Sequence, residues 1–168
     1  MTASRHHLIL ATIEFVRRAR NIAGVTRIAI IGSILTDKPH PKDVDLLVTI
    51  SSEVDIEKLA AAGRRLKGEV QSRNLGADIF LCNPEHSYLG RTCSYRECHV
   101  RVACGGLDCR PRSWIRTDLH VVELRTSLIR DPPLIVWPKT IASRPLPTDL
   151  AQAIESEHCI QEKNQGAA

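Results

Sequence analysis

The sequence predicts an α/β (α+β) fold: a mixed sheet flanked by helices, with an irregular cysteine-rich insertion after the third strand. Through about residue 82, segments with helical periodicity alternate with short runs of β-branched residues, in the order helix, strand, strand, helix, strand. After that point the periodic apolar pattern stops, and four cysteines follow between positions 93 and 109. We therefore expect a regular core followed by a segment with little regular structure.

The composition indicates one globular domain. With 168 residues, 43% hydrophobic and 25% charged, the chain is long enough to bury its own core. A formal charge of +4 is too small to assign a nucleic-acid partner. No run approaches the roughly 20 apolar residues that span a membrane, and the early apolar run contains Glu14 and no signal-peptide cleavage site. We expect a cytoplasmic protein with reduced thiols.

The first helix is expected near the N-terminus. Ser4 can cap it, and Gly24 supplies a stop. Ile9, Ile13 and Val16 recur at helical spacing and therefore share one face. The pattern predicts an amphipathic helix that buries this face.

Two strands are predicted next. Residues 25–31 are rich in β-branched side chains and end at Gly32, and residues 44–50 form a second run of the same kind. Ser51 or Ser52 can then cap a second helix. That helix is expected to extend to Gly68, and a third strand follows at 77–82.

Regular structure is expected to return near the C-terminus. Residues 118–125 resemble a fourth strand, residues 134–138 form a short apolar segment between prolines, and residues 148–163 form a helix capped by Thr148 or Asp149. The expected organisation is a core at 1–82, a Cys-rich irregular module at 83–117, and a C-terminal strand and helix at 118–168 that complete the single domain.

Two aspartates stand out in the second strand. Residues two apart in a strand point to the same side, so Asp43 and Asp45 project together, about 6 to 7 Å apart along the strand. Carboxylate oxygens are ligands that Mg²⁺ prefers. Gly32 and Ser33 end the preceding strand where a helix could begin, and free backbone amides at such a terminus bind phosphate. Together these features predict a site for a metal-bound nucleoside triphosphate.

The same residues carry a family resemblance. An apolar strand, Gly-Ser, a gap of nine residues and Asp-Val-Asp among apolar residues resemble the signature of the DNA polymerase beta-type nucleotidyltransferase superfamily. That family takes a third acidic residue from a later strand, and Asp78 matches it. The resemblance covers residues 25–82. The wider sequence is also similar to a group of small bacterial nucleotidyltransferase-like proteins of undefined function.

The resemblance implies transfer of NMP from an NTP to a hydroxyl group on RNA, a protein or a small molecule. Asp43, Asp45 and Asp78 would bind two divalent cations, Mg²⁺ or Mn²⁺, and Gly32 and Ser33 would hold the triphosphate. Two such cations clamp the attacking and leaving oxygens of an in-line displacement. The expected fold is accordingly of the nucleotidyltransferase type.

The chain departs from that family at one place. Minimal members often carry Arg-Gly shortly after Gly-Ser, whereas this chain continues with "ILTDKP". We include Lys42 in the expected nucleotide site and keep Lys38 and Arg73 as alternative phosphate partners. The acceptor is expected to contact residues 83–168, a second copy of the chain or a partner protein.

Two functional classes stay open: an active nucleotidyltransferase, and a catalytically inactive binding or regulatory module of the same fold. The simpler interpretation of the three aspartates is a set of solvated strand-end carboxylates. For the Gly-Ser pair it is an ordinary turn and helix cap. His86, His120 and His158 lack the spacing of metal ligands, so we expect them in ordinary surface or core roles.

The cysteines allow three interpretations. Thiolates at short intervals between glycine-rich turns can wrap a tetrahedral zinc ion, which with four thiolates would be structural. Unlinked packing thiols are the second interpretation, and disulfides, disfavoured in the cytoplasm, are the third. The candidate ligands are Cys93, Cys98, Cys104 and Cys109.

A basic segment follows the cysteines. Its charges and its tryptophan could bind RNA or a nucleotide by ion pairing and stacking. A solvated basic loop with one buried tryptophan is the simpler interpretation. The residues concerned are Arg110, Arg112, Trp114 and Arg116.

Overall fold

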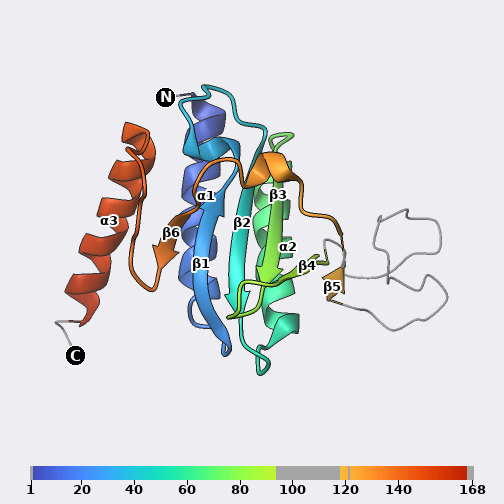
Figure 1. The fold of residues 1–168 in the computed structure, drawn as a ribbon. Coiled ribbons are helices and arrows are strands. Elements are labelled where there is room, and N and C mark those ends of the chain that lie inside the picture. The colour runs from blue at the N-terminus through green and yellow to red at the C-terminus, as the bar shows by residue number, and fades with distance from the viewer. Residues whose placement is uncertain (1, 94–117, 121, 166–168) are drawn as a thin grey trace.

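The computed structural model describes residues 2–93, 118–120 and 122–165 (Figure 1). Its elements are α1 (Ala3–Ala19), β1 (Val25–Ile31), η1 (Ser33–Leu35), β2 (Asp43–Ile50), α2 (Ile56–Gln71), β3 (Gly76–Cys82), β4 (Tyr88–Thr92), β5 (Leu119–His120), η2 (Thr126–Leu128), β6 (Leu134–Trp137) and α3 (Thr148–Gln165). The strands form one sheet in the order β5-β4-β3-β2-β1-β6. β2 and β3 run parallel, and the other described neighbours are antiparallel. The predicted mixed sheet with helices is confirmed.

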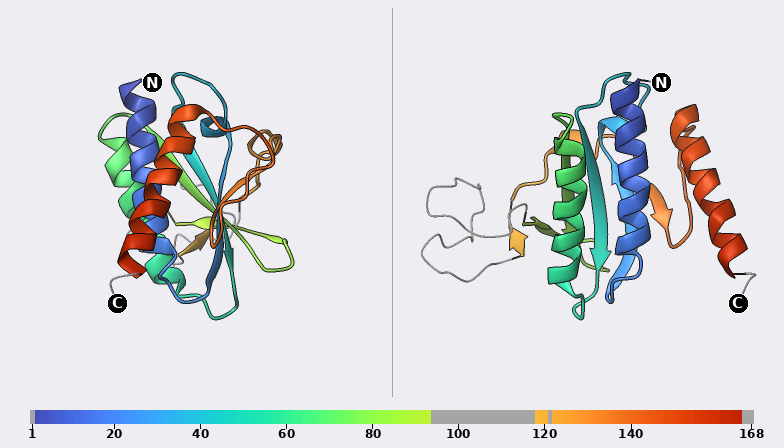
Figure 2. Two further views of the ribbon diagram at one scale, coloured as in Figure 1. Left: turned by 90° about the vertical axis from the view of Figure 1, so that its left-hand side faces the viewer. Right: turned by 180° about the vertical axis from the view of Figure 1, so that it is seen from behind.

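The described helices lie to one side of this sheet. α1 and α2 cover one face, and α3 packs against α1 beside the β6 edge (Figure 2). The segment that contains η2 crosses the opposite face near the ends of β1, β2 and β3 (Figure 1). The sheet face covered by α1 and α2 therefore contributes to the core. The opposite face is not covered by these helices and can form a binding site.

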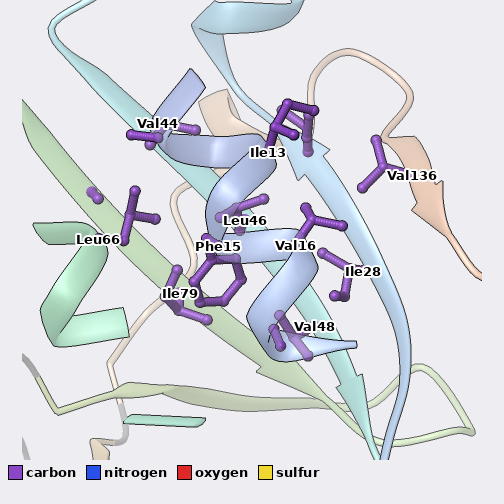
Figure 3. Packing of buried hydrophobic residues seen from close by; sticks show 14 of the residues in the cluster. Ile13, Phe15, Val16, Ile28, Val44, Leu46, Val48, Leu66, Ile79 and Val136 are labelled. Atoms are coloured by element: carbon purple, nitrogen blue, oxygen red, sulfur yellow. The ribbon is translucent and has the colours of Figure 1, made fainter. Parts of the chain in front are cut away.

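The core fills the space between the sheet and the helices. Val44, Leu46 and Val48 of β2 meet Phe15 of α1 in one buried apolar cluster (Figure 3). Each fully buried side chain of this size contributes roughly 1.5 to 3 kcal/mol. Because successive strand residues point to opposite faces, burying this set turns Asp45 away from the helices.

The first helix begins earlier and ends earlier than the sequence predicts. Thr2 is its N-cap, because the Thr2 hydroxyl accepts the N–H of Arg5 at 3.4 Å. The expected cap Ser4 lies inside the helix, so that prediction is wrong by one half turn. Gly24 has φ 78° and lies in the turn before β1, several residues after the last helical residue. The amphipathic helix itself is confirmed, with Ile9, Ile13 and Val16 buried.

The second helix has a different cap from the one expected. Asp55 precedes its first residue, and its carboxylate accepts the N–H of Lys58 at 3.0 Å. The prediction of Ser51 or Ser52 as the cap is wrong, because both precede this position. The helix also continues past Gly68, which an isolated glycine in a helix permits at a modest cost.

β4 lies within the segment that was expected to be irregular. It pairs antiparallel with β3, with Arg91 opposite Phe80. The prediction of irregular structure is therefore wrong for residues 88–92. Gly90 and a register shift interrupt the strand pattern, which is why the sequence does not predict it. β5 is two residues long and shorter than the expected strand at 118–125.

The remaining C-terminal predictions are largely confirmed. β6 falls within the apolar segment between prolines, and α3 begins at Thr148. Thr148 and Asp149 lie inside the first turn of α3, so the prediction that one of them caps the helix is wrong. None of the helices in the described ranges is long and apolar enough to cross a membrane. The predictions for the segment 94–117 concern positions outside the described residues, and these are Cys98, Cys104, Cys109, Arg110, Arg112, Trp114 and Arg116.

Candidate functional site

A pocket of about 470 Å³ lies on the sheet face away from the helices. Its walls come from β2, β3, β4, the turn after β1 and the segment around η2. The lining combines acidic and basic side chains, which suits a ligand that is itself a cation bound to an anion. The lining residues are Gly32, Ser33, Lys38, Asp43, Asp45, Asp78, Phe80, Arg91, Val122, Glu123, Arg125, Ser127 and Leu128.

All three aspartates singled out by the sequence line this pocket. Asp43 and Asp45 lie at the start of β2, and Asp78 lies in β3. Asp45 and Asp78 are direct neighbours in the parallel register, so their side chains leave the same face of the sheet side by side. Parallel pairing of β2 with β3 therefore brings together carboxylates that are more than 30 positions apart in the chain.

Asp45 is the most buried of the three, with 5% of its surface exposed. The pKa of its carboxyl is raised to about 7, mainly by burial and also by the charges of Asp43 and Asp78, while Arg125 acts in the opposite direction. At neutral pH this carboxyl is therefore close to half protonated. A divalent cation in the pocket would favour the ionised form, because it relieves the repulsion among the three carboxylates.

Gly32 makes room for the buried aspartate. Its φ is 76°, and a Cβ atom at this position would lie 2.8 Å from Asp45 Oδ2. The Gly32 N–H donates to the carbonyl of Leu128 at 3.1 Å. That amide is therefore not available to a phosphate, contrary to the expectation from the sequence. The main consequence of glycine here is space for a carboxylate.

Ser33 begins η1, a single 3-10 turn of three residues where the sequence predicts the start of a helix. Its hydroxyl is buried, lines the pocket and has no hydrogen-bond partner in the described structure. Buried hydroxyl groups are nearly always hydrogen-bonded. Ser33 therefore offers a donor and an acceptor to a ligand in the pocket.

Among the described residues, three basic side chains line the pocket, and one of the three was a candidate from the sequence. Lys38 is that candidate. Arg91 and Arg125 come from β4 and from the segment before η2, where no local pattern marks them. Lys42 and Arg73 are exposed and are not among the described lining residues. The structure therefore does not place the expected Lys42, or the alternative Arg73, in the wall of this pocket.

The donor set fits a hard divalent cation, because three carboxylates and a hydroxyl supply only oxygen ligands. In the arrangement described, however, Asp78 Oδ1 accepts a hydrogen bond from Arg91 Nη1 at 2.8 Å. Within residues 2–93, 118–120 and 122–165, no three histidine, cysteine, aspartate or glutamate side chains are already gathered in a metal-ligating group. Coordination of a metal ion by Asp78 Oδ1 would therefore compete with the hydrogen bond from Arg91.

A buried arginine holds the loop between β1 and β2. Arg5, 3% exposed, donates to the carbonyls of Ile34, Thr36 and Lys38 at 2.9 to 3.2 Å. Its remaining donors form a two-point contact with Asp149 at 2.7 and 3.2 Å. This network ties the loop to α1 and α3, and the loop in turn places the pocket residues at both of its ends.

A family model described as "Family of unknown function (DUF6932)" matches residues 1–102. The chain belongs to this family. Comparisons with curated proteins and with solved structures give no match. The family description assigns no activity, so any function must be argued from the geometry of the pocket.

In this DUF6932 member, the matched region contains most of the pocket. It includes the Gly-Ser pair, all three aspartates, Lys38 and Arg91. The remaining lining residues, among them Glu123 and Arg125, follow the matched region. Cys93 is buried directly after β4, inside the match, whereas the other three candidate zinc ligands lie outside the described residues.

Proposed function

We propose that this chain is a metal-dependent nucleotidyltransferase that moves NMP from an NTP to a hydroxyl group of RNA, a protein or a small molecule. One observation carries the proposal: Asp43, Asp45 and Asp78, from two adjacent parallel strands, line a single pocket together with Gly32 and Ser33. Solvated strand-end carboxylates do not explain this, because Asp45 is buried at a cost that its neighbours increase.

The three carboxylates are the groups that would hold Mg²⁺ or Mn²⁺. When bound, such cations neutralise phosphate charge and lower the pKa of an attacking hydroxyl. Asp43 is exposed and lines the pocket, so it is accessible to solvent. Asp45 is buried and its Oδ2 lies next to Gly32, so the surrounding chain restricts the position of its carboxylate. Fixed oxygens of this kind are what an in-line displacement requires for positioning.

The other lining residues suit a triphosphate. Lys38, Arg91 and Arg125 bring positive charge to the same pocket, and Ser33 offers an unpartnered hydroxyl. Charge-assisted hydrogen bonds to phosphate are about twice as strong as neutral ones. These side chains would take the place of the Arg-Gly element that the sequence lacks after the Gly-Ser pair. They would bind the triphosphate and stabilise the negative charge that develops on pyrophosphate.

A second candidate is a binding or regulatory module of the same architecture without turnover. It is favoured by the ion pair that engages Asp78 and by the lack of an already assembled metal group among the described residues. A module of this kind would bind the nucleotide without transferring it. Binding and transfer must therefore be tested separately.

Binding is tested by thermal unfolding with Mn²⁺ and a nonhydrolysable NTP analogue. A ligand that binds only the folded state raises its melting temperature. The wild type is expected to gain several degrees, and Asp45→Asn is expected to gain little. Asp37→Asn is the matched control, because Asp37 is an exposed aspartate that does not line this pocket, and it should respond like the wild type. An equal rise in all three proteins would show that the ligand binds elsewhere.

A further inference from the structure

Arg91 is bound to one of the carboxylates on which the proposed metal site depends. Its Nη1 atom donates to Asp78 Oδ1 at 2.8 Å, and the two side chains are 22% and 33% exposed. Arg91 stands opposite Phe80 on the neighbouring strand, and Phe80 is two residues from Asp78 on the same face of β3. The sheet register therefore holds the guanidinium beside this carboxylate.

This contact conflicts with metal binding. An arginine stays protonated at every accessible pH, so the guanidinium cannot give up its charge when a cation arrives. A carboxylate oxygen that accepts a charge-assisted hydrogen bond must lose that bond, or share its charge, before it can coordinate a metal ion. The guanidinium and a divalent cation therefore compete for Asp78.

The same guanidinium has an unused donor. Arg91 Nε is buried and has no hydrogen-bond partner in the described structure. The planar fork of an arginine matches phosphate with two parallel N–H donors, whereas the single contact to Asp78 uses one nitrogen. Lys38 and Arg125 line the same pocket, so a phosphate there would meet positive charge from several sides.

We propose that Arg91 is an exchange residue, which pairs with Asp78 until a divalent cation binds the carboxylates and then transfers its guanidinium to a phosphate group of the nucleoside triphosphate. The inference rests on the proposed function, because it takes its two ligands from it. Metal and nucleotide then favour each other's binding through Arg91, in addition to their direct contact. By thermodynamic linkage the effect is reciprocal.

The first test measures Mn²⁺ binding without nucleotide, by electron paramagnetic resonance of free Mn²⁺. Arg91→Gln is expected to bind Mn²⁺ about tenfold tighter than the wild type, equivalent to about 1.4 kcal/mol. Lys38→Gln is the matched control: it removes the same charge from the same pocket and breaks no described pair with a carboxylate. It should change Mn²⁺ affinity by no more than about twofold, as a screened charge predicts.

The second test measures the nonhydrolysable NTP analogue at saturating Mn²⁺ by calorimetry. Arg91→Gln should bind it about tenfold more weakly, because the phosphate contact is lost. Asp78→Asn provides an independent arm that leaves Arg91 in place. In that variant the guanidinium has lost its charged partner, so the analogue should bind more tightly than to the wild type when Mn²⁺ is absent.

The outcomes separate the exchange from the transferase proposal. Tighter Mn²⁺ binding in Arg91→Gln supports the exchange even if no label is ever transferred. Mn²⁺ affinity in Arg91→Gln equal to that of the wild type, or raised no more than in Lys38→Gln, overturns it even in an active enzyme. If Arg91→Gln fails to fold, the Asp78→Asn arm decides: unchanged metal-free affinity for the analogue overturns the exchange.

Discussion

The carboxylate of Asp45 occupies the space next to Gly32 that a side chain at that position would need. A Cβ atom built on Gly32 would lie 2.8 Å from Asp45 Oδ2, a distance that real Cβ contacts do not show. The φ of 76° is also in the left-handed region that favours glycine. The buried position of the Asp45 carboxylate therefore depends on a glycine at position 32.

Gly32→Ala is expected to lower the free energy of unfolding by roughly 1 to 3 kcal/mol, because it adds backbone strain and displaces a buried carboxylate. Gly68→Ala is the matched control, since nothing lies within 4 Å of a Cβ there and the residue is inside α2. That variant should be stabilised by about 0.8 to 1 kcal/mol. Urea unfolding measures both. A Gly32→Ala protein as stable as the wild type would contradict the proposed dependence.

The carboxyl of Asp45 should make the metal-free protein less stable as the pH rises. Its pKa is about 7 in the folded chain and near 3.8 when unfolded, so the folded state holds the proton more tightly. The contribution of the Asp45 carboxyl to the free energy of unfolding is therefore complete below about pH 4 and is lost as the pH rises to about 7. The loss amounts to a few kcal/mol at most, at about 1.4 kcal/mol per pKa unit.

Unfolding with chelator present, compared between wild type and Asp45→Asn from pH 5 to 8, measures this contribution. The wild type should lose stability relative to Asp45→Asn as the pH rises, because asparagine does not titrate. A stability difference that stays constant across this range would show that Asp45 keeps an ordinary carboxyl pKa.

Arg5 is expected to be a main determinant of stability. Arg5→Ala leaves Asp149 and three backbone carbonyls without their donor, and removing one partner of such a buried pair costs about 3 to 5 kcal/mol. Lys58→Ala is the control, because its pair with Asp55 is exposed and screened, and it should change stability far less. Equal losses in the two variants, measured by chemical unfolding, would refute this role for Arg5.

The structural zinc site remains a prediction, since three of its four candidate ligands lie outside the described residues. Elemental analysis of protein purified without added metal should find about one zinc per chain, as one four-thiolate site requires. Cys98→Ser or Cys104→Ser should lose that zinc. Zinc far below one per chain in the wild type would rule the site out and leave packing thiols or disulfides.

The sequence predicts the elements whose signal is local. β1 and β2 are apolar runs rich in β-branched residues, β3 is a short apolar run, and α1 has one apolar face at helical spacing, so local sequence is sufficient to find them. β4 is not predicted, because Gly90 and a register shift obscure its alternation and its partner strand supplies the stability. The caps at Thr2 and Asp55 differ from those expected, because several nearby polar residues could serve equally well.

The same distinction applies to the pocket. The aspartates and the Gly-Ser pair have a recognisable spacing in the chain. Arg91 and Arg125 have none, because they reach the pocket only through the pairing of β4 with β3 and through the path of the segment before η2. The local sequence does not predict the role of Arg5 for a similar reason, since its partners are backbone carbonyls and an aspartate 144 positions away.

Transfer of labelled nucleotide tests the central claim most directly. The purified protein is incubated with each labelled NTP, Mg²⁺ or Mn²⁺, and a bacterial lysate that supplies RNA, protein and small-molecule acceptors. The Asp43→Ala and Asp45→Ala double variant serves as the comparison. We predict that the wild type transfers label from at least one NTP to an acceptor and that the double variant does not. Equal transfer by both proteins, or none by the wild type with any NTP and metal, would contradict the assignment of this pocket as a nucleotidyltransferase active site.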